Sequence, residues 1–176
     1  HEQSAAFMAD VYGRLTGRAG VCLATLGPGA TNLVTGVADA NSDGAPLVAL
    51  TGQVDTEYMH LTSHQYLDLV EMFEPVTKRS HQVVRPDTVN ELVRIAFKYA
   101  ECEKPGAVHI DLPDDVSKME IQSEFGKQPL KPHRPSRESA STDLVEEAAG
   151  LISRANNPVV LVGHAAVRNQ AGEALT

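Results

Sequence analysis

The chain has 176 residues, a formal net charge of −8 at pH 7 and a hydrophobic content of 42%. This length accommodates one domain and the beginning of another, and the hydrophobic content is that of a globular protein rather than a disordered one. Because phosphate binding needs a basic surface and no apolar run approaches the roughly 20 residues that cross a bilayer, we expect neither nucleic acid nor a membrane as a partner.

Helical spacing of apolar residues alternates with short apolar runs along the first two thirds of the chain. In chain order, these patterns predict helix 3–16, strand 21–26, helix 30–42, strand 46–52, short helix 66–73, strand 76–84, helix 87–102 and strand 107–112. Apolar runs without alternation are typical of strands buried on both faces of a parallel sheet. The alternation therefore predicts an α/β fold whose mostly parallel sheet is flanked by helices.

The composition changes after the fourth predicted strand. Residues 122–142 contain Pro129, Pro132 and Pro135 together with serines and mixed charges, a composition typical of an extended linker. Beyond it, the pattern predicts an amphipathic helix at 143–155 and a strand at 158–163. We therefore expect a first domain over residues 1–121, a linker over 122–142 and the beginning of a second α/β domain over 143–176.

A glycine-rich turn follows the first predicted strand. Gly27-Pro28-Gly29 leads directly into a predicted helix, and the ends of parallel strands next to helix N-termini bind ligands in open α/β folds. The turn lacks the third glycine of the dinucleotide fingerprint and the Lys-Ser/Thr pair of a P-loop. Judged by these residues alone, a ligand site and a purely structural tight turn are equally good interpretations.

Cysteines and histidines give little sign of further chemistry. Cys22 and Cys102 have no Cys-x-x-Cys or His/Cys ligand spacing, so we expect two reduced thiols in a cytoplasmic protein. His60, His64 and His81 also lack tight metal-ligand spacing, so no metal site is expected in this chain. Since the chain does not begin with Met, we expect its true N-terminus, with any targeting segment, to be missing.

A family resemblance runs through most of residues 1–116. The segments that carry it are 1–10, 26–32, 36–40, 43–46, 51–53, 75–78, 104–108 and 111–116. In their order and spacing, these segments resemble the thiamine-diphosphate-dependent acetolactate synthase (acetohydroxyacid synthase) family. The resemblance implies that residues 1–121 are the family's pyrimidine-binding domain without its N-terminal part, and that residues 143–176 begin the central domain.

The resemblance implies that Glu2 is the catalytic residue and that it binds the cofactor. In this family, the matching glutamate bonds a ring nitrogen of the aminopyrimidine and promotes loss of the C2 proton of the thiazolium. We expect burial in a largely apolar site to raise the pKa of this carboxyl toward working pH. The alternative is an ordinary glutamate whose charge stabilises the first turn of a helix.

Four further residues match positions that line the cofactor site in this family. They are Pro28, Gly29, Asn32 and Gln65. Turn geometry is the alternative role for Pro28 and Gly29, capping of a helix N-terminus for Asn32, and a solvated loop amide for Gln65. The resemblance further implies Mg²⁺, held through a diphosphate-binding domain that this chain does not contain.

Two features favour the catabolic type of the family over the flavin-containing biosynthetic type. The segment His64 to Lys78 resembles the catabolic enzymes, and Lys104 stands where the biosynthetic enzymes carry an arginine that helps to hold FAD. Lysine lacks the planar, bidentate guanidinium of arginine. The replacement puts FAD in doubt.

The implied activity is decarboxylation of pyruvate and condensation of the hydroxyethyl unit with a second pyruvate to give acetolactate and CO₂. The resemblance implies a homodimer or homotetramer, because the family's cofactor lies between two subunits, and an inactive fragment if this chain stands alone. Three alternatives stay open. They are a 2-oxoacid decarboxylase acting on pyruvate or another 2-oxoacid, an acyl-CoA decarboxylase or sulfoacetaldehyde acetyltransferase, and a non-catalytic α/β binding module. A nicotinamide-dinucleotide domain is disfavoured by the glycine spacing.

Overall fold

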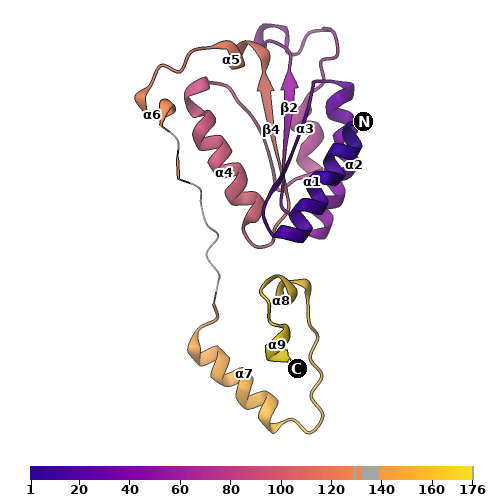
Figure 1. The fold of residues 1–176 in the computed structure, drawn as a ribbon, viewed down its shortest axis with the longest axis vertical. Helices are drawn as coiled ribbons and strands as arrows, with labels where there is room; N and C mark the ends of the chain where they lie inside the picture. The colour runs from indigo at the N-terminus through magenta and orange to yellow at the C-terminus, as the bar shows by residue number, and fades with distance from the viewer. Residues whose placement is uncertain (129, 132–138, 176) are drawn as a thin grey trace. The chain divides into compact units, whose positions relative to one another are not determined.

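The structure is a computed structural model, and it describes residues 1–128, 130–131 and 139–175. The chain divides into two compact units, residues 1–135 and residues 136–176 (Figure 1). Eight of the nine residues outside this description, 129 and 132–138, belong to the predicted linker. No helix in the described ranges is long and apolar enough to cross a membrane.

The first unit is built on a parallel four-stranded sheet. Its strands are β1 (Gly20–Ala24), β2 (Leu47–Gln53), β3 (Arg79–Gln82) and β4 (Ala107–Pro113), in the spatial order β1-β2-β4-β3. All three pairings are parallel, with Cys22 opposite Ala49 and Ala49 opposite His109. The predicted α/β fold with a parallel sheet flanked by helices is therefore confirmed.

Helices connect the strands and cover both faces of the sheet (Figure 1). They are α1 (Glu2–Thr16), α2 (Pro28–Asp43), α3 (Leu69–Phe73), α4 (Val89–Glu101), α5 (Asp114–Lys118) and α6 (Glu124–Lys127), with 3₁₀ turns at Thr56–Tyr58, Glu74–Val76 and Pro86–Thr88. Alternate strand residues face opposite sides of a sheet. Leu47 and Ala49 accordingly pack in the core with α1, α2 and α3. Val48 and Val108 pack in a second core with α4 and α5.

Close packing and an ion cluster hold α1 against α2. A Cβ added at Gly36 would lie 2.6 Å from the Cβ of Ala6, so glycine is what allows the two helices to approach this closely. Arg14 of α1 bonds Asp10 on its own helix at 2.9 Å and Asp39 of α2 at 2.8 Å, and it also pairs with Asp43. This packing fixes the beginning of α1 beside the beginning of α2.

The second unit contains α7 (Thr142–Arg154), α8 (His164–Arg168) and α9 (Gly172–Leu175). The amphipathic helix predicted at 143–155 is present, but the strand predicted at 158–163 is wrong, because these residues are neither helix nor strand. A strand needs a partner with which to exchange backbone hydrogen bonds, and the described residues of this unit hold no other strand. Val159 and Leu161 are accordingly 90% and 98% exposed.

Candidate functional site

The candidate site lies where β1 ends and α1 and α2 begin. Glu2 is the first residue of α1, and its Oε2 accepts a hydrogen bond from Nδ2 of Asn32 on α2 at 3.1 Å. A Cβ added at Gly29 would lie 3.6 Å from the other carboxylate oxygen, Oε1 of Glu2. The structure therefore brings together three predicted site residues, with Oε2 of Glu2 bonded to Asn32 and Oε1 close to Gly29.

The glycine turn takes a shape that only glycine adopts readily. Gly27 has a φ of 56° and is the N-cap of α2, with no side chain bonding the first N–H groups of the helix. Pro28, the first residue of α2, is exposed, and its fixed φ suits this position. Backbone carbonyls, rather than a side chain, accept from the first N–H groups, since Gly29 donates to Leu26 at 3.2 Å and Thr31 donates to Gly27 at 3.0 Å.

Gln65 lies directly on this turn. A Cβ added at Gly27 would come within 2.7 Å of the backbone oxygen of Gln65 and 2.8 Å of its Cβ. Gln65 is exposed and has a φ of 60°, which places it in the left-handed region that non-glycine residues rarely adopt. The connection from β2 to α3 therefore brings this predicted residue from the middle of the chain to the turn that adjoins Glu2.

The carboxyl of Glu2 does not show the raised pKa that the sequence led us to expect. Its pKa lies below the usual value, first because its own backbone N–H bonds the carboxylate, and second because Asn32 donates to it. Glu2 is partly exposed, so burial, which raises the pKa, has a smaller effect than these two hydrogen bonds. In the structure described, Glu2 is thus an ionised acceptor at a helix N-terminus, where negative charge is favoured.

Asn32 does not cap a helix. It is the fifth residue of α2, whose N-cap is Gly27, and its side chain instead points to Glu2. His60 bonds Tyr66 through Nδ1 at 3.1 Å. In the ranges that the structure describes, no group of three or more His, Cys, Asp or Glu residues is placed to hold a metal ion.

A buried polar network lies next to this edge and was not predicted from the sequence. His109 and Asp111 on β4 and Thr51 on β2 are each at most 1% exposed. Thr51 donates to Oδ1 of Asp111 at 2.7 Å, so its hydroxyl oxygen accepts from Nε2–H of His109 at 2.8 Å. Nδ1 of His109 then accepts from the Ser80 hydroxyl at 2.8 Å. The signal in the sequence was a set of polar residues inside otherwise apolar strands, which is costly unless each finds a partner.

Burial dominates the titration of this network. Removal from water lowers the pKa of His109 to about 3, with a smaller contribution from His81. The ring of His109 stacks on Phe73 of α3 at 4.1 Å between centroids. Burial raises the pKa of Asp111, and the hydrogen bonds from Gln82, Thr51 and Gln53 oppose that rise.

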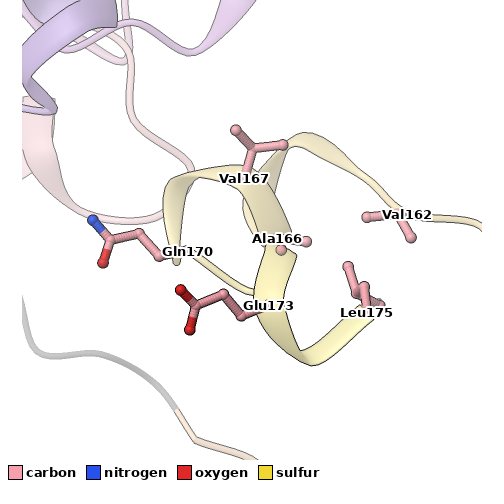
Figure 2. A pocket seen from close by; sticks show the side chains of 7 residues that line it. Val162, Ala166, Val167, Gln170, Glu173 and Leu175 are labelled. Carbon is pink, nitrogen blue, oxygen red and sulfur yellow. The ribbon is translucent and has the colours of Figure 1, made fainter.

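A surface depression in the second unit is unrelated to these residues. It is lined by Val162, Ala166, Val167, Gln170, Gly172, Glu173 and Leu175. Figure 2 shows Val162 and Leu175 on one side of it and the polar ends of Gln170 and Glu173 directed to the other. None of the predicted site residues lines this depression.

Comparison with known proteins supports the resemblance found in the sequence. Residues 1–72 match the family model described as the thiamine pyrophosphate enzyme, N-terminal TPP binding domain. The chain is 42% identical to a probable acetolactate synthase large subunit of Methanocaldococcus jannaschii, a match covering 99% of this chain and 30% of that protein. It is 41% identical to the catabolic acetolactate synthase of Raoultella terrigena, with 99% and 31% covered.

A third relative, the acetolactate synthase large subunit of Corynebacterium glutamicum, is 40% identical over 99% of this chain and 28% of its own length. The chain thus spans about 30% of the length of the curated relatives that it matches. Catabolic and other synthases match almost equally well, so identity does not separate the two types. The predicted resemblance to the acetolactate synthase family is confirmed.

Proposed function

We propose that this chain is the pyrimidine-binding portion of a thiamine-diphosphate-dependent acetolactate synthase. The observation that carries the proposal is the juxtaposition of Glu2, Asn32 and Gly29 at one sheet edge, in a segment that matches a thiamine pyrophosphate domain. The complete enzyme would decarboxylate one pyruvate and join the two-carbon unit to a second, giving acetolactate and CO₂. The relatives' names support this activity.

The residues at the edge fit an aminopyrimidine ring. Oε1 of Glu2 lies 3.6 Å from the position of a Cβ on Gly29. When protonated, this carboxyl can donate to an unprotonated ring nitrogen, and it can accept from the ring N–H once the proton has moved. Pro28, Gly29, Asn32 and Gln65 would line the bound ring. When bound, thiamine diphosphate supplies the carbon nucleophile that attacks the 2-oxoacid.

The role of Glu2 is to hold a proton at Oε1 and exchange it with the ring. Asn32 occupies Oε2, so it fixes the orientation of the carboxyl and leaves one oxygen for this exchange. A cofactor ring that covers Glu2 would exclude water and raise the pKa of the carboxyl from its lowered value toward working pH. In this proposal the bound cofactor provides the burial that the chain alone lacks.

Several finer features belong to the same proposal. Mg²⁺ would be held through a domain outside this chain, and the enzyme would be a cytoplasmic homodimer or homotetramer. We favour a catabolic, FAD-independent enzyme because of Lys104. Its Nζ reaches the Ser42 carbonyl at 3.4 Å, at the end of α2 opposite to the glycine turn.

Product analysis of the complete protein tests this function. Purified protein would be given pyruvate, thiamine diphosphate and Mg²⁺ without added FAD, and the same preparation scanned for flavin absorbance. Acetolactate from flavin-free protein is the expected result. Acetaldehyde as the product would indicate a sister decarboxylase. Activity only with FAD would indicate the biosynthetic type, and failure to bind thiamine diphosphate would indicate a non-catalytic module.

A further inference from the structure

We propose that Gln53 is a positioning residue that holds residues 54–68, the connection from β2 to α3, in place. It thereby keeps Gln65 against the glycine turn beside Glu2, and the catalytic part of this inference rests on the proposed function. Gln53 is 2% exposed at the end of β2. Its Nε2 donates to the backbone oxygen of Leu67 at 2.9 Å, and its Oε1 accepts from the backbone nitrogen of Val54 at 3.0 Å. One buried amide thus joins the first and the penultimate residue of the connection.

Asp111 fixes the orientation of that amide. Its Oδ2 accepts from Nε2 of Gln53 at 3.4 Å and from Nε2 of Gln82 at 2.8 Å. Both the carboxylate and the Leu67 carbonyl are acceptors, so only the NH₂ end of Gln53 can face them. The buried network therefore reaches the candidate site through Gln53.

A second tether holds the beginning of the same connection. Asp115, just after β4, accepts from the Thr56 backbone nitrogen at 3.0 Å and from the Thr56 hydroxyl at 2.5 Å. The connection is therefore held at both ends, by Gln53 at the end of β2 and by Asp115 in α5 just after β4.

Burial does little to anchor the connection between these tethers. Leu61 is 58% exposed and Leu67 is 41% exposed, so these side chains contribute little apolar burial. Segments with few buried apolar contacts open readily unless hydrogen bonds hold them. The placement of Gln65 against Gly27 thus depends on the tethers, and Gln53 is the buried one.

Hydrogen exchange of the amides in 54–68 tests the tether without turnover. Gln53→Met and Gln82→Met each remove one donor to Asp111, but only Gln53 touches the connection. We expect exchange to be about tenfold faster or more in Gln53→Met, the effect of its two lost hydrogen bonds to the connection, and unchanged in Gln82→Met. Equal exchange in the two variants would overturn the proposal. Gln53→Asn, which is too short to span both partners, provides the same comparison if Gln53→Met does not fold.

A double-mutant comparison in the complete protein tests the link to Gln65. We expect Gln53→Met to lower kcat about three- to tenfold with KM for pyruvate changed less, and to have no further effect in a Gln65→Ala background. An undiminished effect in that background would contradict action through Gln65. A complete protein that makes no acetolactate would overturn the proposed function, while the exchange comparison would still decide whether Gln53 holds the connection.

Discussion

Acid should destabilise the first unit through His109 in a pH range where few other groups contribute. The pKa of His109 is about 3 in the folded chain, against an ordinary value of 6.5. As the pH falls below 6.5, the histidine of the unfolded state binds a proton, whereas the buried His109 of the folded state does not. Stability from this group is therefore fully present above pH 6.5 and is lost progressively toward pH 3.

The size of the loss follows from the shift. On going from pH 7.5 to pH 5.0, about 1.5 pH units lie below the ordinary histidine pKa of 6.5. Over these units the histidine of the unfolded chain binds a proton while folded His109 stays neutral, so the free energy of unfolding falls by about 2 kcal/mol. The carboxylates whose pKa is lowered, such as Asp87 and Asp115, lose their contributions only at more acidic pH. The interval from pH 7.5 to pH 5.0 therefore avoids the range in which these two carboxylates titrate.

Urea unfolding followed by circular dichroism at the two pH values provides the assay. His109→Gln should be less stable at pH 7.5, because the stacking on Phe73 is lost, but its stability should change about 2 kcal/mol less between the two pH values. Asp111 titrates in both proteins, so its contribution largely cancels. His64→Gln, at an exposed position, is the matched control and should keep the wild-type pH dependence. An equal pH dependence in His109→Gln and wild type would show that the burial of neutral His109 does not govern acid stability.

Two further substitutions test the geometry around the site. Gly27→Ala should destabilise the chain by about 1–3 kcal/mol, because it forces a side chain into a positive φ and against the Gln65 backbone. In Gly52→Ala the added Cβ would meet its nearest atom at 3.7 Å, so the free energy of unfolding should stay within about 0.5 kcal/mol of wild type. Similar urea midpoints for Gly27→Ala and Gly52→Ala would show that the positive φ and the contact at Gly27 do not matter for stability. Arg14→Met should lower the free energy of unfolding by about 2 kcal/mol, because Asp10 is 2% exposed and would keep an unpaired charge. An unchanged urea midpoint in this variant would show that the packing of α1 on α2 does not need the ion cluster.

The fold of the first unit could be predicted because its local patterns and its tertiary contacts agree. Apolar runs such as 107–112 became strands buried on both faces, and helix 87–102 formed with only small differences at its ends. The strand predicted at 158–163 failed because an apolar run specifies a strand only when another strand pairs with it. Local sequence does not reveal whether that partner is present.

The candidate site was likewise only partly predictable from the sequence. Physical reasoning from the sequence placed only the glycine turn at a sheet edge that can bind a ligand, and the grouping of Glu2, Gly29 and Asn32 there came from the family resemblance. The placement of Gln65 rested on resemblance alone, since its connection has no hydrophobic period to locate it. The network of Thr51, His109 and Asp111 was missed because its hydrogen bonds join strands that are distant in sequence.

Exchange of the C2 proton of thiamine diphosphate for deuterium measures most directly whether Glu2 exchanges a proton with the cofactor ring. The complete protein would be mixed with the cofactor in D₂O, quenched in acid and analysed by proton NMR, with Glu2→Gln compared with wild type and with Glu120→Gln at an exposed surface position. We predict that Glu2→Gln slows the exchange by about a hundredfold or more while thiamine diphosphate still binds. Exchange at the wild-type rate in Glu2→Gln, with the cofactor bound, would show that Glu2 does not take part in this proton exchange.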